Sequence, residues 1–254
     1  MNDTSVVNVP TFPTHGRIAC RRCFKDDSDI QILSEWQIVN DPGAWGSAIP
    51  EVMVLGFSKG FTQANAYRSG RFEDIPFKDM RPRLTDALRA IGVLELTEKV
   101  DEKMDASELR LGFGSLVRCS LSRMNEKNGR LECTGKVMPK AFVEEVSAIV
   151  HRCAETFLVS LPASTRLVLM LGTTNAYIRG CKSLIKALHG QDYTELNEVG
   201  YRTGPVHWAH ISHPSPLNGH HGKWLDGQPS TKPGRKRLLA EEIIRLSGAV
   251  LRGR

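Results

Sequence analysis

The chain has 254 residues, of which 41% are hydrophobic and 24% charged, with a formal net charge of +6 at pH 7. This composition is ordinary for a globular protein, and no stretch reaches the roughly 18 uncharged apolar residues of a membrane span, which argues against a membrane protein. Residues 1–13 have neither the basic nor the apolar region of a secretory signal, so we expect a cytoplasmic protein.

The predicted elements alternate between strands and helices. Short apolar runs predict strands, and apolar residues at helical spacing predict helices. In chain order these are a strand over 52–57, a helix over 83–91, a strand over 111–119, a helix over 141–161, a strand over 166–171, a helix over 173–188, a strand over 206–211 and a helix over 237–251. The alternation predicts a three-layer α/β/α fold around a central, mostly parallel four-stranded sheet.

The chain shows neither an internal repeat nor a convincing linker. We therefore expect a single domain over 14–254, preceded by a flexible N-terminal arm over 1–13. Basic residues concentrate over 118–140 and 232–254. This charge is compatible with a polyanionic partner such as DNA, although solvated loops and helix faces commonly carry it too.

Candidate functional residues follow three of the predicted strands. They lie within 56–60, 115–119 and 213–222. The last segment places His213 just after a buried strand, and two prolines behind it prevent a helix and stiffen the turn. Because the carboxyl ends of parallel strands converge on one crevice, we expect the three segments to form one site.

The chain has six cysteines, and only Cys20 and Cys23 form a C-x-x-C pair. In a cytoplasmic protein such cysteines do not suggest a disulfide framework. The pair suits zinc, an iron–sulfur cluster or redox exchange, but the acidic residues after Cys23 do not resemble the helix of a thioredoxin-like unit. Two of four ligands come from this pair, so a metal site needs two more from distant parts of the chain.

An ordered set of motifs resembles the uracil-DNA glycosylase superfamily. The motifs are Gly-Phe-Ser-Lys-Gly at 56–60, Ala-Asn at 64–65, Arg-Ser-Gly-Arg at 68–71 and His-Pro-Ser-x-x-Asn at 213–218 with Gly222. They are most similar to the iron–sulfur family five branch, then to family four, over roughly 18–225. The resemblance implies a monofunctional enzyme of base excision repair, a monomer that hydrolyses the N-glycosidic bond of uracil or a related deaminated base in DNA.

The resemblance also implies a 4Fe-4S cluster, held by the N-terminal C-x-x-C and two later cysteines. The implied ligands are Cys20, Cys23, Cys119 and Cys153. Cys133 is the alternative fourth ligand, and choosing Cys153 makes the region near 122–140 an insertion. Zinc is the alternative metal, and Cys119 and Cys153 could instead be buried apolar cysteines.

The resemblance assigns roles around an extruded base. Phe77 would stack on the base, with Phe57 as the alternative platform or as a core residue, and Ser115 would read the base edge. His213 would donate a hydrogen bond to the carbonyl of the departing base. The other substrate-binding positions are Gly56, Ser58, Asn65, Ser215 at a phosphate and Asn218, which would also brace its loop.

The catalytic carboxylate departs from the superfamily pattern, because residues 56–60 contain none. The family five branch carries an aspartate a few residues after its phenylalanine. Asp79 lies two residues after Phe77, one short of that spacing, and is the expected counterpart, with Asp74 second. Asp79 could instead cap the helix that begins near residue 81. Lys59 is unusual in this motif, and we expect it to face phosphate or solvent.

Two other functions stay open. A catalytically impaired iron–sulfur DNA-binding protein of the same fold would explain the missing carboxylate. A zinc-stabilised α/β protein with a small-molecule substrate, unrelated to the superfamily, is the third hypothesis.

Overall fold

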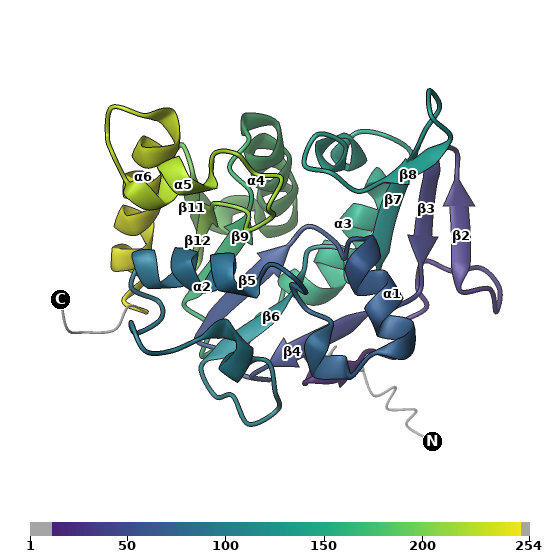
Figure 1. The fold of residues 1–254 in the computed structure, drawn as a ribbon, viewed down its shortest axis with the longest axis horizontal. Coiled ribbons are helices and arrows are strands. Elements are labelled where there is room, and N and C mark those ends of the chain that lie inside the picture. The colour runs from purple at the N-terminus through teal and green to yellow at the C-terminus, as the bar shows by residue number, and fades with distance from the viewer. Residues whose placement is uncertain (1–11, 250–254) are drawn as a thin grey trace, which may run out of the picture.

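The computed structural model describes residues 12–249, and within them the main sheet has eight strands in the order β1-β4-β6-β5-β9-β12-β11-β10 (Figure 1). The strands are β1 (Gly16–Arg17), β4 (Gly43–Gly46), β5 (Val52–Gly56), β6 (Leu111–Ser115), β9 (Leu167–Leu171), β10 (Tyr193–Asn197), β11 (Gly200–Thr203) and β12 (Val206–Ile211). The four apolar runs of the sequence form β5, β6, β9 and β12. The predicted arm over 1–13 falls largely outside the described residues.

The predicted four-stranded, mostly parallel sheet is wrong. In the described part of the chain the main sheet has three parallel pairings, β6·β5, β5·β9 and β9·β12, and four antiparallel ones. The added strands lack the continuous apolar runs that mark a strand buried on both faces: β4 reads Gly-Ala-Trp-Gly, and β10 is exposed or half-buried throughout. Antiparallel edge strands need only short connections, such as the turn at Gly204 (φ 53°) between β11 and β12.

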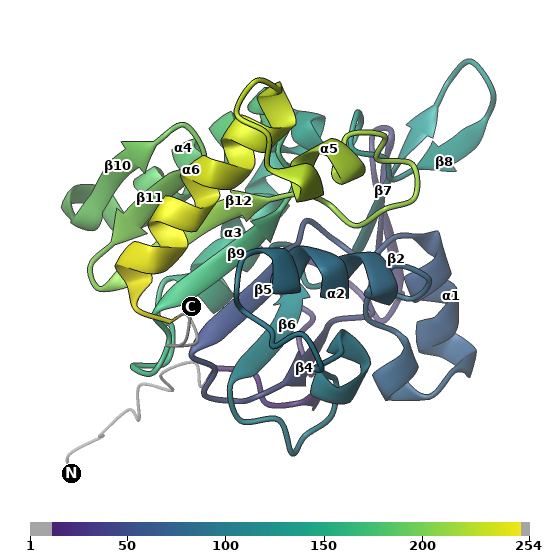
Figure 2. The same ribbon diagram turned by 60° about the vertical axis from the view of Figure 1, so that its left-hand side comes forward.

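A second sheet also departs from the prediction. It consists of β2 (Ile30–Leu33), β3 (Trp36–Val39), β7 (Ser120–Asn125) and β8 (Arg130–Glu132), paired antiparallel in the order β2-β3-β7-β8. Most of the predicted insertion near 122–140 is therefore a hairpin built onto N-terminal strands, and Figure 2 shows this β7–β8 hairpin extending outward. Trp36 and Ile38 are buried beneath the sheet, which ties it to the core.

Helices cover both faces of the main sheet (Figure 2): α2, α5 and α6 lie in front of it in that view, with α3 and α4 behind. The α-helices of the described residues are α1 (Phe61–Ser69), α2 (Arg81–Ala90), α3 (Ser147–Leu158), α4 (Asn175–His189), α5 (His221–Asp226) and α6 (Lys232–Ser247). The predicted helix over 141–161 begins later than expected. Glu144 accepts hydrogen bonds from Trp36 Nε1 and Arg123 Nε, both 2.9 Å away, which anchors this stretch to the second sheet. Across the described residues, the structure has no helix with the length and apolar character needed to span a bilayer.

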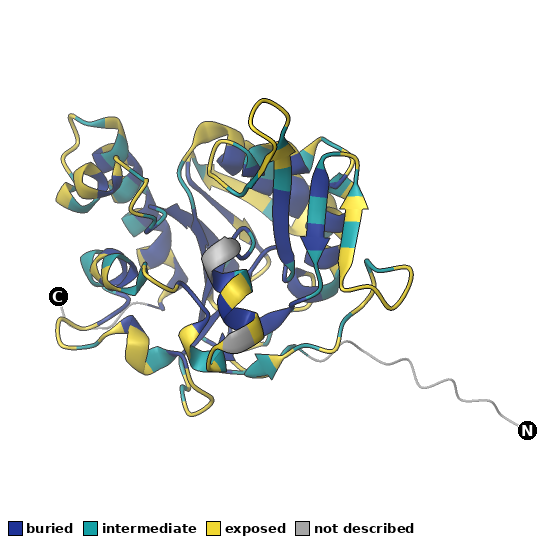
Figure 3. Cartoon of the chain, turned by 45° about the vertical axis from the view of Figure 1, so that its right-hand side comes forward, coloured by how far each residue is buried: buried dark blue, intermediate teal, exposed yellow. Residues whose placement is uncertain are grey.

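Successive side chains of the central strands point alternately into two apolar clusters, one on each face of the sheet. Val52 and Val54 of β5 pack into one apolar cluster with α2 and α6, whereas Met53 and Leu55 pack into the other with α3 and α4. Figure 3 shows these strands as the most buried part of the chain. Both faces of the sheet are thus filled with side chains, and the strand ends remain for function.

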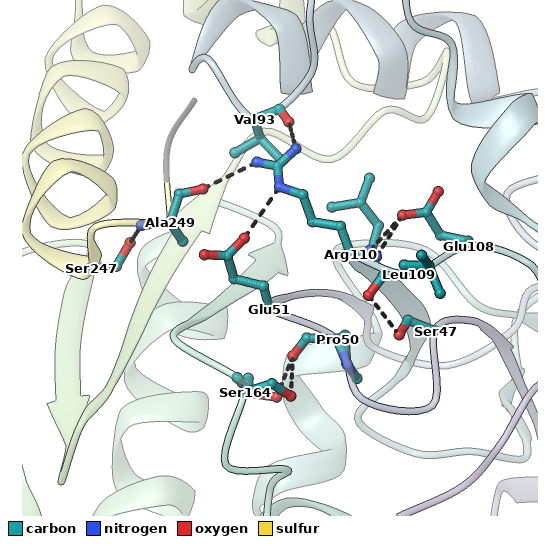
Figure 4. Close-up of polar contacts among 12 residues, drawn as sticks. Ser47, Pro50, Glu51, Val93, Glu108, Leu109, Arg110, Ser164, Ser247 and Ala249 are labelled. Atoms are coloured by element: carbon teal, nitrogen blue, oxygen red, sulfur yellow. Dashed lines mark hydrogen bonds and ion pairs between the residues drawn. The ribbon is translucent and has the colours of Figure 1, made fainter. Parts of the chain in front are cut away.

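Arg110 closes the amino-terminal edge of the sheet (Figure 4). Its Nη1 donates to Val93 O at 2.9 Å, its Nη2 donates to Ala249 O at 3.1 Å, and its Nε lies 3.3 Å from the Glu51 carboxylate. Every nitrogen of this guanidinium has a partner, and the three contacts join the start of β6 to the end of the described chain.

Candidate functional site

The loops after β5 and β6 lie side by side at the carboxyl edge of the sheet. Gly56 pairs with Ser115, and the backbone N–H groups of Leu116 and Val117 donate to Gly56 O at 2.9 Å and to Phe57 O at 2.8 Å. Ser115 is 5% exposed at the end of its strand. The first motif and the candidate base-reading serine are therefore adjacent.

The ring of Phe77 lies beside the first motif. A Cβ built on Gly56 would stand 3.8 Å from Phe77 Cε1, and Phe77 meets Phe113 edge-on with ring centroids 6.2 Å apart. Phe77 has a φ of 52°, in the left-handed region that a residue with this side chain seldom adopts. Phe77 is 5% exposed and belongs to the same core cluster as Phe113, so the ring is packed into the core beside Gly56. Strained backbone of this kind concentrates at functional sites.

His213 stands at the same level of the sheet. Ile211 of β12 pairs with Leu171 of β9, and the neighbouring β5·β9 register sets Leu55 against Met170, so Gly56 and Ile211 end their strands together. Two strand spacings separate β5 from β12, which is about 10 Å. His213, two residues past Ile211, therefore lies at the same edge of the sheet as residues 56–58.

The His213 ring is a neutral hydrogen-bond donor. Its Nδ1 accepts the backbone N–H of Ser215 at 3.1 Å, which leaves the ring proton on Nε2. Burial, and to a lesser degree the nearby His221, lowers the pKa of His213 to about 4. At neutral pH the side chain is therefore uncharged and presents an N–H group.

The loop that carries His213 is braced from within. Asn218 Nδ2 donates to His213 O at 2.8 Å and to Ser212 Oγ at 3.0 Å, and its Oδ1 accepts from His220 N at 3.1 Å. The buried Ser212 hydroxyl lies 3.1 Å from His221 Nδ1. Ser215 Oγ accepts the N–H of Leu217 at 3.2 Å, so its hydroxyl proton is left to donate. This is the bracing geometry expected for Asn218.

Arg83 holds the His213 loop in place through contacts that the sequence did not reveal. From α2, its Nε donates to Pro214 O at 2.9 Å and its Nη2 to Asn218 O at 3.2 Å. The guanidinium thereby clamps the His213 loop onto α2, directly downstream of Phe77. No pattern in the sequence marks this role, because Arg83 has the same local context as any arginine on a helix.

We expect Arg83→Met to loosen this clamp. Losing charged hydrogen bonds should lower the free energy of unfolding by about 1.5–3 kcal/mol. Urea unfolding measures the change. Arg89→Met is the matched control, because Arg89 lies on the same helix and loses two hydrogen bonds to Glu98 O instead. Hydrogen exchange of the amides at 215–218 should rise in Arg83→Met and stay at the wild-type level in Arg89→Met, and an equal change in the two variants would contradict the clamp.

The pKa of His213 predicts how stability changes with pH. Its folded-state pKa of about 4 lies below the ordinary 6.5, so between these values the unfolded chain binds a proton that the native protein does not. The free energy of unfolding should therefore fall as pH drops from about 6.5 to 4. Urea unfolding across this range should show a shallower slope for His213→Asn; an unchanged slope would contradict the burial of a neutral His213.

The two candidate carboxylates, Asp79 and Asp74, are exposed to solvent. Asp79 is exposed and has a φ of 63°, and Asp74 is exposed in a short 3-10 turn, Phe72–Asp74. The capping alternative for Asp79 is wrong: Met80 occupies the N-cap of α2, and no side chain makes a capping hydrogen bond there in the described chain. Asp79 thus follows Phe77 on a tight turn and faces solvent.

The other motif residues divide between core and surface. Phe57 is buried edge-on to Phe142 and Tyr177, with centroids 5.4 and 6.0 Å apart, which places it in the core, the second option that the sequence left open. Ser58 Oγ lies 3.8 Å from Met138 Sδ. Asn65 is exposed on α1.

Lys59 does not face phosphate or solvent, contrary to expectation. It is 3% exposed, its Nζ lies 3.3 Å from Asp41 Oδ1, and it donates to Arg118 O. Asp41 also accepts from Ser120 N at 2.7 Å and from Ser120 Oγ at 2.6 Å. A buried charge persists only with such partners, and this group pins the chain on both sides of Cys119.

The four predicted cysteine ligands surround one cavity. Its lining includes Cys20, Cys23, Cys119 and Cys153, together with Arg118, Arg152 and Phe157. Burial raises the pKa of the Cys119 thiol to about 12 and that of Cys153 to about 11, so both stay protonated unless a cationic centre displaces the proton. Four cysteines that are distant in sequence thus line one apolar cavity.

Cys133 lies elsewhere. A Cβ built on Gly60 would stand 3.4 Å from Cys133 Sγ, and Cys133 is not among the described residues that line the cavity. The placement favours Cys153 over Cys133 as the companion of the other three cysteines.

The cavity suits an anionic group with sulfur ligands. Arg118 is 1% exposed, and its Nε, Nη1 and Nη2 have no hydrogen-bond partner among the described residues. Its backbone N–H donates to Cys153 Sγ at 3.2 Å, and Arg152 lines the same cavity as Cys23. Two arginines beside four thiols fit the charge of a thiolate-bound cluster, whose sulfurs commonly accept hydrogen bonds.

In the described residues, no group of three or more histidine, cysteine, aspartate or glutamate side chains is arranged so that it could hold a metal ion. Among known proteins, no family model matches the chain and no curated protein matches its sequence.

Proposed function

We propose that the protein is a DNA glycosylase that hydrolyses the N-glycosidic bond of uracil or a related deaminated base. The observation that carries the proposal is a neutral histidine, His213, just past the end of a strand whose register sets it level with Gly56 and Ser115. The ordered motifs that resemble the uracil-DNA glycosylase superfamily support it. Such an enzyme must take its target base out of the stack and hold it in a pocket.

The proposed chemistry is the addition of water across the bond between the sugar C1′ and the base nitrogen. As this bond breaks, its electron pair moves to the base and negative charge grows on the base carbonyl. His213 Nε2–H donates a hydrogen bond there, in a buried site where such an interaction is strong. Water supplies oxygen to C1′ and a proton to the base, leaving an abasic site and the free base.

Phe77 and Ser115 supply the pocket. The ring of Phe77 provides an apolar face on which the base stacks, and the Ser115 hydroxyl can both donate and accept at the base edge. A rotatable hydroxyl discriminates less between bases than an amide does. We therefore propose a preference broad enough to include hypoxanthine and xanthine beside uracil.

Leu217 is the side chain that we propose to be inserted into the duplex when the base is extruded. It is 89% exposed in the loop braced by Asn218 and Arg83. Proteins that unstack DNA insert apolar side chains of this kind between base steps. Ser215, two residues away, would contact a phosphate on the same strand.

The proposed cofactor is a 4Fe-4S cluster held by Cys20, Cys23, Cys119 and Cys153. When bound, it would supply a rigid cross-link among the N-terminal segment, the loop after β6 and helix α3, which braces the wall behind the crevice. The glycosidic hydrolysis itself uses only the residues of the crevice.

Asp79 is the proposed carboxylate that orients water or stabilises the cationic sugar. Because it is exposed, DNA would have to enclose it. We expect Asp79→Asn to slow base release by about 10²- to 10⁴-fold, the contribution of a positioned acid–base group, with DNA affinity retained. The assay is abasic-site formation on oligonucleotides containing uracil, hypoxanthine or xanthine, with binding measured in parallel.

The second candidate is a DNA-binding protein that has lost catalysis, and the exposure of Asp79 favours it. It predicts no base release from any of the three substrates. Affinity would fall with salt, by roughly 0.9 in log affinity per log salt for each phosphate neutralised. Wild-type release above background, lost in Asp79→Asn, would rule this candidate out.

A further inference from the structure

The Arg118 guanidinium fills a space that is open only because residue 114 is a glycine. It follows β6, and its side chain folds back over that strand, because a Cβ built on Gly114 would fall only 1.8 Å from Arg118 Nη1. Glycine is thus required beneath the guanidinium. On the other side, the Arg118 Cζ lies 5.3 Å from the centroid of the Phe157 ring on α3.

The guanidinium has no anionic partner among the described residues. Its three nitrogens are buried without a hydrogen bond, and the Phe157 ring offers only a weak cation–π contact. Arg110 shows the contrast, since each of its nitrogens meets an acceptor or a carboxylate (Figure 4). A buried charge without a partner is strongly unfavourable, which indicates that the partner is a group not supplied by the polypeptide.

Arg118 lines the cysteine cavity together with Cys153. Cys153 lies one turn before Phe157 on α3, and its Sγ accepts the Arg118 backbone N–H at 3.2 Å. Asp41, the buried carboxylate on the Cys119 side, is already engaged by Lys59 and Ser120. The negative charge available to Arg118 is therefore the charge that the cysteines of the cavity carry once they bind a metal centre as thiolates.

Resting on the cofactor proposed above, we propose that Arg118 is the buried counter-charge of the cluster and determines how firmly the cluster is held. Four thiolates around a four-iron core leave the assembly negative, and a guanidinium beside it lowers the energy of that charge in an apolar cavity. Arg118 is a positioning residue: it touches neither DNA nor the bond that breaks.

The test compares cluster retention in anaerobically loaded protein. Wild type, Arg118→Met and Arg118→Lys are exposed to an iron chelator, and iron per chain and visible absorbance are followed over time. Arg118→Met keeps the packing volume without the charge, and we expect it to lose iron about 10- to 100-fold faster, the usual cost of removing an outer partner of a metal site. Arg118→Lys should stay near wild type. Arg110→Met, an arginine outside the cavity, should match wild type in iron loss.

Each outcome decides the proposal. Equal iron loss from wild type and Arg118→Met would overturn it, as would equal losses from Arg118→Lys and Arg118→Met. If Arg118→Met does not fold, Arg118→Gln against Arg118→Lys makes the same comparison. Wild type that loads no iron would also overturn it, whereas base release by that same protein would leave the glycosylase proposal standing, so the two failures are distinguishable.

Discussion

His213→Ala lowers the single-turnover rate of uracil release by about 10²- to 10³-fold, the usual cost of removing one hydrogen-bond donor aimed at developing negative charge. The expectation rests on the 3.1 Å bond from Ser215 N to Nδ1, which leaves the proton on Nε2. The effect should fall on the rate at saturating enzyme rather than on DNA affinity, because the interaction strengthens only as the base departs.

The control for this experiment lies in the same loop. His220 is exposed, and only its backbone N–H contributes to the brace, by donating to Asn218 Oδ1. His220→Ala should therefore release uracil at the wild-type rate. If His213→Ala retains that rate too, the histidine is structural and the proposed mechanism fails.

Cys153→Ser should abolish cluster binding, whereas Cys133→Ser should leave it intact. Cys153 lines the cavity with the other three cysteines, and Cys133 lies beside Gly60 instead. Wild type and Cys133→Ser should carry about four iron atoms per chain after anaerobic loading, as a 4Fe-4S centre requires. Iron and sulfide analysis together with the visible spectrum measures the difference.

The opposite pattern, with iron lost from Cys133→Ser and kept by Cys153→Ser, would assign the fourth ligand to Cys133. A colourless protein with about one zinc per chain would replace the cluster with a structural zinc site. Thermal unfolding of both variants without metal provides the control for the fold, since serine is close to cysteine in size.

The candidate site could be anticipated only where its residues carry a local signal. His213 was found because it directly follows an apolar strand and precedes two prolines, and Cys20 and Cys23 because of their spacing. Arg83 and Arg118 were missed, since an arginine that clamps a loop or fills a buried cavity has the same sequence context as one in solvent. Lys59 was misjudged for this reason: its partner, Asp41, is remote in sequence, and only the fold brings the two together.

By itself the sequence determined the four central strands and most of the helices, because runs such as Leu167–Leu171 must be buried on both faces wherever they lie. Only the tertiary structure decided the extent of the sheets. Half-buried strands such as β10 and β2 gain stability from their neighbours rather than from their own composition, so their pairing is non-local. The meeting of four cysteines around one cavity was decided in the same way, by chain packing that brings residues 20 and 153 together.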